Sequence, residues 1–193
     1  MTMTKRALIV VDVQPDFCEA GALPVTGGDA VADRIADLLD SEHGYDLVVA
    51  TRDQHIDPGP HFSDEPDFVD SWPPHCVVGT PGAEFHPDLD PRGFAAVFDK
   101  GAHAAAYSGF EGTVGGEEHG ESLEAFLRRH DVTEVDVCGL AYDYCVKATA
   151  IDAAAVGFRT RVLVDLTASV HPENDDALGE ELVSLGVDTH TAH

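Results

Sequence analysis

The sequence predicts an α/β fold, a three-layer doubly wound domain whose mostly parallel central sheet of about six strands is flanked by helices. Two observations support this fold class. Short, largely apolar runs alternate with longer amphipathic stretches along most of the chain, as is typical of parallel strands mostly buried on both faces. The chain is also 44% hydrophobic, enough for a sizeable core. We therefore expect a single domain over residues 1–193.

Five of the apolar runs are expected to form strands. They span residues 7–11, 47–50, 95–98, 135–138 and 162–164. Between them, residues 29–39 place Val31, Ile35 and Leu38 at helical spacing, and the residues from Leu123 to Leu127 repeat that pattern. Two further helices are expected over about 143–157 and 173–185, because glycine follows or ends each stretch.

The segment over about 53–91 is the exception to this alternation. It is rich in Pro, Gly, His and Asp, and it lacks clear periodicity. It is also far longer than most connections in compact domains, and long ordered loops are usually functional. We expect it to be a functional loop region.

Composition excludes several classes of protein. The formal net charge of −25 excludes a nucleic-acid binder that works through a basic patch. Only five apolar residues, 7–11, precede Asp12, so the start of the chain offers neither a signal sequence nor a membrane span, and a cytoplasmic protein is expected. Four scattered cysteines without a CxxC pair predict free thiols. The acidic surface suggests a halophilic protein, the alternative being an ordinary acidic one.

Reactive side chains follow the predicted strands. Asp12, Asp53 and Lys100 come at or just after strand ends, and Cys145 lies beyond residues 135–138 at the start of a predicted helix. Ligands of open parallel sheets bind beyond the carboxyl ends of the strands, so we expect these side chains to converge at one edge.

Cys145 is the candidate nucleophile, because a helix N-terminus stabilises a thiolate and a nearby ammonium such as Lys100 lowers the thiol pKa further. Asp12 is expected either to pair with Lys100 or to relay the thiol proton. Taken singly, each residue has an ordinary alternative: a packed thiol, a turn carboxylate and a surface lysine. Their joint position at one edge favours the catalytic interpretation.

A second set of residues, Asp53, His55, His61 and His75, has the chemistry of a metal site. Asp53 and His55 face the same way in an extended segment, and two more imidazoles complete a set that suits zinc, iron or manganese. The alternative is a loop that is rich in histidine by chance, since the chain has 11 histidines. Aromatic residues that could wall an apolar pocket lie beside both sets, and they are Phe17, Trp72 and Tyr107.

The chain resembles the nicotinamidases (pyrazinamidases) of the cysteine hydrolase superfamily that also contains the isochorismatases. The resemblance covers nearly the full length and rests on seven segments in the right order. They span residues 11–17, 51–55, 60–62, 72–80, 99–101, 106–111 and 139–146, with the sequences VDVQPDF, TRDQH, PHF, WPPHCVVGT, DKG, AYSGFE and GLAYDYCV.

The resemblance implies roles for individual residues. It assigns Asp12, Lys100 and Cys145 to catalysis, the amides of Ala141 and Cys145 to an oxyanion hole, and a cis peptide to Leu140 and Ala141. It assigns Phe17, Trp72 and Tyr107 to substrate stacking, and Asp53, His55, His61 and His75 to one divalent metal ion.

The implied activity is hydrolysis of nicotinamide to nicotinate and ammonia through a cysteine thioester, a step of NAD salvage, with a homo-oligomer as the expected assembly. The alternatives are a superfamily hydrolase that acts on another small amide or on isochorismate, and a protein that only binds a metal or a small ligand. The chain departs from many relatives at Tyr142, where they carry threonine; a larger ring beside the nucleophile could reshape the pocket, and this leaves the substrate preference open.

Overall fold

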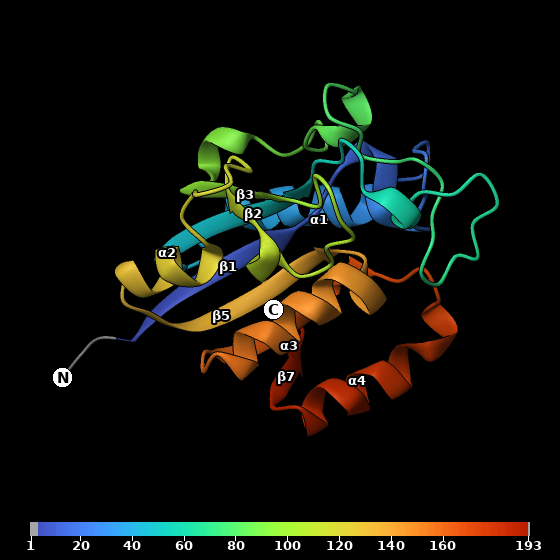
Figure 1. Cartoon of the computed structure of the whole chain (residues 1–193). Coiled ribbons are helices and arrows are strands. Elements are labelled where there is room, and N and C mark those ends of the chain that lie inside the picture. Colours follow the sequence, from blue (N-terminus) through green and yellow to red (C-terminus); the bar gives the residue numbers. More distant parts are fainter. Residues whose placement is uncertain (1–3, 193) are drawn as a thin grey trace.

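The computed structural model describes residues 4–192, in which a seven-stranded sheet lies between two layers of helices (Figure 1). The strand order is β4-β3-β2-β1-β5-β6-β7, and every neighbouring pair is parallel except β3 and β4. The strands are β1 (Lys5–Val11), β2 (Leu47–Asp53), β3 (Ala96–Lys100), β4 (Thr113–Val114), β5 (Val132–Leu140), β6 (Arg159–Ala168) and β7 (Val187–His190). The predicted fold class is confirmed.

The sheet has two edge strands that the apolar pattern did not predict, so the predicted count of about six strands is slightly low. β4 has only two residues, too few for any period, and β7 reads Val-Asp-Thr-His with one buried residue. Both are edge strands, each with a single partner in the sheet. Only β4 is antiparallel to its neighbour.

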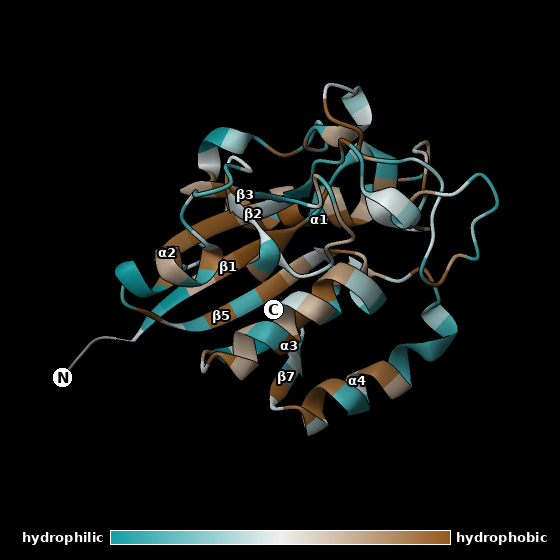
Figure 2. Ribbon diagram, viewed as in Figure 1, coloured by the Kyte–Doolittle hydropathy of each residue, from teal (hydrophilic) through white to brown (hydrophobic). Residues whose placement is uncertain are grey.

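The helices cover both faces of the sheet, and the central strands therefore bury both of their faces. Along β1, Ala7, Ile9 and Val11 belong to one core and Leu8 and Val10 to the other. The first core lies under α2 (Leu123–Arg129), α3 (Lys147–Ala155) and α4 (Asp175–Ser184), and the second lies under α1 (Gly28–Asp40). Figure 2 shows the central strands as the most continuously hydrophobic elements.

The third predicted helix is divided in two. Its first turn, Tyr142–Val146, is π-helical, and α3 continues from it. π-helical turns are rare and often mark functional sites. The fourth helix likewise begins with a 3-10 turn, Pro172–Asn174, before α4.

The chain reverses its direction of winding between β1 and β5, which are neighbours in the sheet. A crevice therefore opens beyond the carboxyl ends of these two strands, where ligands of doubly wound sheets bind. Gly139 stands at this point with φ of 114°, and a Cβ there would lie 2.1 Å from the carbonyl oxygen of Val11. Glycine thus permits the close approach of β5 to β1 beside the crevice.

Residues 54–91 form an irregular segment beyond β2, coloured cyan to green in Figure 1. Its regular structure is limited to short 3-10 turns, including η2 (Gly59–His61) and η3 (Pro81–Ala83), and to isolated bridges that pair His55 with Val77 and Phe62 with Trp72. Within residues 4–192, none of the helices combines the length and the apolar character needed to cross a membrane.

Candidate active site and metal centre

Four strand or helix ends bring the predicted reactive residues together. Asp12 follows β1, Asp53 ends β2, Lys100 ends β3, and Cys145 lies in the π-helical turn after β5. All four side chains are buried. The four side chains therefore meet at one edge of the sheet, as their positions at strand ends predict.

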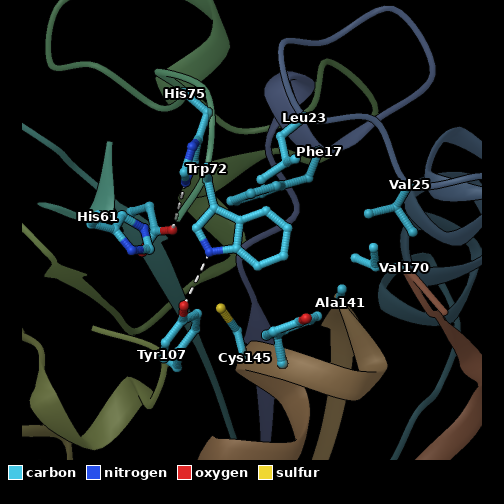
Figure 3. A pocket seen from close by; sticks show the side chains of 12 residues that line it. Phe17, Leu23, Val25, His61, Trp72, His75, Tyr107, Ala141, Cys145 and Val170 are labelled. Atoms are coloured by element: carbon cyan, nitrogen blue, oxygen red, sulfur yellow. Dashed lines mark hydrogen bonds and ion pairs between the residues drawn. The ribbon is translucent and has the colours of Figure 1, made fainter. Parts of the chain in front are cut away.

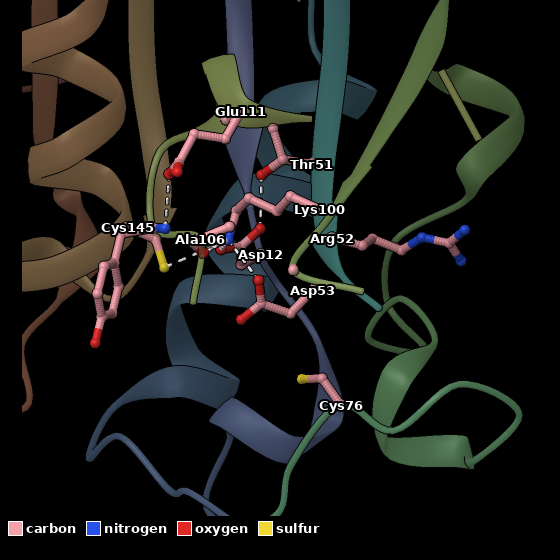
Figure 4. Close-up of polar contacts among 12 residues, drawn as sticks. Asp12, Thr51, Arg52, Asp53, Cys76, Lys100, Ala106, Glu111 and Cys145 are labelled. Carbon is pink, nitrogen blue, oxygen red and sulfur yellow. Dashed lines mark hydrogen bonds and ion pairs between the residues drawn. The ribbon is translucent and has the colours of Figure 1, made fainter. Parts of the chain in front are cut away.

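Lys100 is the centre of the cluster (Figure 4). Its Nζ lies 2.9 Å from Asp12 Oδ2 and 2.5 Å from Asp53 Oδ1. It also donates to the carbonyl oxygen of Ala106 at 2.9 Å and lies 3.7 Å from the Sγ of Cys145. A single ammonium thus faces two carboxylates and the thiol, which compensates buried charge that would otherwise be costly.

Asp12 is oriented by its backbone and by a hydroxyl. Its φ is 48°, and its Oδ1 accepts a hydrogen bond from Thr51 Oγ1 at 2.6 Å. Its other oxygen meets Lys100 but takes no aligned hydrogen bond among the described residues. A carboxylate oxygen of Asp12 lies within 4.8 Å of the Cys145 sulfur. Asp12 thus places a base close to the thiol, as proton transfer requires.

The protonation states differ from the sequence-based expectation for Cys145. Burial raises the pKa of the Cys145 thiol well above its usual value, and the opposing effect of Lys100 does not outweigh burial and the two carboxylates. Burial also raises the pKa of Asp12. Although burial alone disfavours the ammonium, Asp12 and Asp53 raise the pKa of Lys100 well above its usual value. The resting site therefore holds a neutral thiol, which needs a base, rather than the lowered thiol pKa that was expected.

Three imidazoles form a cluster beside the carboxylate of Asp53. Ring nitrogens of His55, His61 and His75 lie within 4.8 Å of one another. The Nδ1 of His55 lies 2.6 Å from the carbonyl oxygen of Gly101, and that of His75 lies 2.8 Å from the carbonyl oxygen of Pro73. Backbone carbonyls that hold one ring nitrogen in this way leave the other as a metal ligand.

The cluster has the properties of a metal site. His55 Nε2 and His61 Nδ1 are buried and have no hydrogen-bond partner among the described residues. Burial, together with His55 and His75, lowers the pKa of His61 to about 4, so this imidazole is neutral and able to bind a cation. Asp53 Oδ2 lies 3.5 Å from His55 Nε2 and 3.9 Å from His75 Nε2. The residues present thus fit a divalent ion.

Asp53 connects the two clusters. One of its oxygens contacts Lys100 and the other faces the histidines. Although burial disfavours its charged form, Lys100 and His55 hold the pKa of Asp53 below its usual value. Gln14 fixes its backbone, because Gln14 Oε1 accepts from the Asp53 N–H at 2.8 Å and Gln14 Nε2 donates to the Asp53 carbonyl at 2.9 Å. The sequence argument missed Gln14, since no spacing distinguishes a glutamine that faces inward.

A small pocket lies over Cys145 (Figure 3). Phe17, Trp72 and Tyr107, the three predicted aromatics, line it, and the Trp72 indole donates to the Tyr107 hydroxyl at 3.1 Å. Other lining residues include Ala141 and Cys145, whose amides the resemblance assigns to the oxyanion hole. The apolar, aromatic walls suit a small flat ligand.

Two residues that shape this pocket were not predicted. Tyr144 lines it and meets the Trp72 ring edge-on with centroids 5.0 Å apart. Glu111 holds the segment that carries Tyr107, because its Oε2 accepts from the backbone N–H of Tyr107 at 3.0 Å and of Ser108 at 2.9 Å. The only signal for Tyr144 is its position next to the nucleophile.

The Leu140–Ala141 peptide is cis, as the resemblance implies. Tyr142, by contrast, does not lie where it was expected. Its side chain is buried in the core under α4 and borders a separate hollow with Val164 and Thr167, and it is absent from the residues that line the pocket over Cys145. The expectation that this ring reshapes the pocket is therefore wrong, because the π-helical turn points residues 142 and 144 in different directions.

Comparison with known proteins identifies the family. Residues 6–193 match the model of the isochorismatase domain. The nicotinamidase/pyrazinamidase of Mycobacterium tuberculosis is 56% identical over 95% of this chain and 97% of its own. The pyrazinamidase of Pyrococcus horikoshii, solved in complex with zinc, has a TM-score of 0.79 and 38% identity over 97% of this chain and 99% of its own. PnC1 from L. infantum, solved in complex with nicotinate, has a TM-score of 0.83 and 36% identity over 98% of this chain and 93% of its own. The chain belongs to the isochorismatase family.

Proposed function

We propose that this protein, as one domain over residues 1–193, is a nicotinamidase that hydrolyses nicotinamide to nicotinate and ammonia. The observation that carries the proposal is the buried contact of Lys100 with Asp12 and Cys145 at the base of an aromatic pocket beside the histidine cluster. The relative from Mycobacterium tuberculosis bears the name of this activity, and the L. infantum structure holds the product.

In the first half of the reaction, Asp12 takes the thiol proton as the sulfur of Cys145 attacks the carboxamide carbon. Lys100 stabilises the anionic groups, and the amides of Ala141 and Cys145 donate to the oxygen on which negative charge develops. The carbon–nitrogen bond then breaks as Asp12 returns the proton to the leaving nitrogen. Ammonia departs, and the acyl group remains on Cys145 as a thioester.

In the second half, a water molecule replaces ammonia at the same position. Asp12 accepts a proton from this water as its oxygen attacks the thioester carbon. The carbon–sulfur bond breaks, the proton returns to Cys145, and nicotinate is released. The raised pKa of the buried Asp12 brings its affinity for protons closer to that needed for both transfers.

Asp53, His55, His61 and His75 would hold the divalent ion, and zinc is the ion we propose, because three imidazoles and a carboxylate suit it. The zinc complex of the Pyrococcus horikoshii relative supports this choice over iron or manganese. When bound, the ion supplies a Lewis-acidic partner for the ring nitrogen of the substrate. Phe17 and Trp72 would stack on the ring and exclude water from its faces.

The decisive experiment measures ammonia and nicotinate release from nicotinamide by the metal-loaded protein and by Cys145→Ala. Release by the unaltered protein alone supports both the substrate and the nucleophile. If the folded, metal-loaded protein releases neither product, nicotinamide is not the substrate, and other small amides and isochorismate are the next substrates to assay.

We also propose that the protein is cytoplasmic and adapted to high salt concentrations. All four cysteines are free and buried, as suits a reducing compartment. A net charge of −25 on 193 residues favours a chain whose self-repulsion is screened by salt. Melting temperatures measured from low to molar KCl are expected to rise, and a cooperative melt that is lost at molar KCl would contradict salt adaptation.

A further inference from the structure

A second cluster of metal-ligating side chains lies away from the pocket over Cys145. Cys18 directly follows η1 (Pro15–Phe17), Asp29 is in the first turn of α1, and His86 comes from the irregular segment after η3. One ligand atom of each lies within 4.8 Å of the others. Three segments far apart in the sequence thus present a thiol, a carboxylate and an imidazole to one point.

The imidazole is held at both nitrogens. His86 Nε2 lies 3.2 Å from Asp29 Oδ1. On the other side of the ring, Nδ1 lies 3.4 Å from the carboxylate of Asp88 and 3.3 Å from its backbone nitrogen. A carboxylate behind a histidine is the arrangement that orients and strengthens imidazole ligands in zinc sites. Asp88 therefore has the position of a residue that supports a ligand.

The cluster opens into a surface hollow that Cys18, Asp29 and His86 all line. Asp16 and Glu84 also line it. An ion can therefore enter from solvent, and the carboxylates around the hollow attract a cation on a surface that is already strongly negative. Cys18 itself is only 2% exposed, so its sulfur lies at the inner end of the hollow.

We propose that Cys18, Asp29 and His86 form a second metal site, separate from the histidine cluster, that binds a borderline-soft divalent cation such as Zn²⁺. Thiolate, imidazole and carboxylate are the donor types that zinc takes, and a water completes a four-coordinate shell. Bond lengths of about 2.0–2.3 Å place the ligand atoms of one ion roughly 3–4 Å apart, so the cluster closes around the ion with small side-chain movements.

Metal binding at this second site changes the protonation of Cys18 and His86. The thiol of Cys18 loses its proton to solvent as the sulfur–metal bond forms. In the structure, His86 Nδ1 accepts from the backbone N–H of Asp88 at 3.3 Å. Binding through Nε2 moves the remaining imidazole proton to Nδ1, which then donates to the Asp88 carboxylate instead, 3.4 Å away. Because the thiolate is the form that binds metal, uptake is expected to weaken as pH falls.

The site would act on the structure rather than on the reaction. None of its three ligands lines the pocket over Cys145. However, Phe17, which does line that pocket, directly precedes Cys18. A metal ion here would tie η1 to the start of α1 and to the segment around His86, and so stabilise one wall of the pocket.

Cobalt titration of the Cys145→Ala protein tests the proposal, because this background removes the thiol that lies with Asp12 and Asp53 in another group of possible metal ligands. Two cobalt equivalents and a near-ultraviolet thiolate-to-cobalt charge-transfer band are expected. The band and the second equivalent should disappear when Cys18→Ala is added, and should persist when Cys138→Ala, another buried thiol, is added instead. A single bound equivalent without the band would overturn the proposal.

Further variants separate metal binding from a plain hydrogen-bonded cluster. Asp88→Asn is expected to lower the affinity for the second cobalt equivalent by about 10- to 100-fold, while the affinity for the first is unchanged. His86→Ala should remove it. Far-ultraviolet circular dichroism and turnover by Cys18→Ala, made in the chain that keeps Cys145, report whether the substitution itself unfolds the protein. If Cys18→Ala and His86→Ala stay folded and still bind two equivalents, the cluster is not a metal site.

Discussion

The catalytic cluster and the histidine cluster share Asp53, yet they are held in different ways. Strand register places the catalytic residues: Asp53 pairs with Lys100 across β2 and β3, and Val11, just before Asp12, pairs with Thr51 across β1 and β2. The histidines lie on residues 54–91, where isolated bridges and two backbone carbonyls hold them.

The two clusters also differ in charge balance. Lys100 lies between two carboxylates, so the catalytic cluster contains a cation of its own that offsets one of its two negative charges. The histidine cluster leaves His55 Nε2 and His61 Nδ1 buried without partners in the part of the chain that the structure describes. Buried polar groups are costly when unpaired, so a cation completes the second cluster while the first forms without one.

The largest effect is expected from Cys145→Ala. Without the sulfur no thioester forms, and turnover of nicotinamide should fall by about 10⁴-fold or more. Metal content should stay unchanged, because Cys145 is not among the histidine cluster. Turnover assays with elemental analysis check this. Substantial residual turnover would mean that the reaction does not pass through the cysteine.

Asp12→Asn removes the base while Lys100 keeps its partner Asp53. Turnover should fall by about 10²- to 10⁴-fold, as is typical for a general base. In the unaltered protein, activity should be lost as pH falls through the raised pKa of Asp12, because only the carboxylate accepts the thiol proton. The pH dependence of kcat/KM measures this, because the loss of activity at low pH should disappear together with the Asp12 carboxylate. A variant that keeps the same low-pH loss would contradict the assignment of Asp12 as base.

Metal removal should affect the histidine cluster far more than the sheet. Chelation is expected to abolish most activity and to expose residues 54–91 to proteases. It should also lower the free energy of unfolding by about 2.7 kcal/mol, compared with the protein in the presence of the ion at 100 times its Kd. Limited proteolysis and thermal melts before and after zinc is restored measure these effects. An apoprotein whose segment resists proteolysis would show that the segment is ordered without the ion.

Gly101→Ala targets the contact between the clusters. A Cβ there would lie 2.6 Å from Cε1 of His55, so the ring must move away from the carbonyl that orients it. Metal affinity is expected to fall by about 10- to 100-fold. Gly79→Ala is the matched control, because Gly79 also has positive φ, 83°, but its Cβ would meet nothing within 4 Å. Isothermal titration with zinc compares the two, and equal losses would point to backbone strain alone.

The smallest effect is expected at Tyr142. Tyr142→Phe should change kcat/KM by less than about twofold, since the ring lies under α4 and does not line the pocket over Cys145. Tyr144→Ala should instead raise KM with a smaller change in kcat, because that ring lines the pocket. Steady-state kinetics with nicotinamide distinguish the two neighbours, and a larger effect at Tyr142 would contradict the orientation of the π-helical turn.

Periodicity and strand ends in the sequence determined much of this protein. The interior strands are continuous apolar runs because helices cover both of their faces, and a parallel sheet collects its strand ends at one edge. Asp12, Asp53, Lys100 and Cys145 could therefore be grouped without knowledge of the fold's details. β4 and β7 could not be predicted, because edge strands need only one partner and carry little apolar signal.

The tertiary structure alone decided the remaining features. Gln14, Glu111 and Tyr144 act through contacts between segments far apart in the chain, which no local spacing encodes. The direction in which the pKa of Cys145 shifts depends on the balance between burial and the charge of Lys100. That balance exists only once the groups are packed together. Local sequence sets the periods of helices and strands, whereas the energy of a buried charge depends on every group around it.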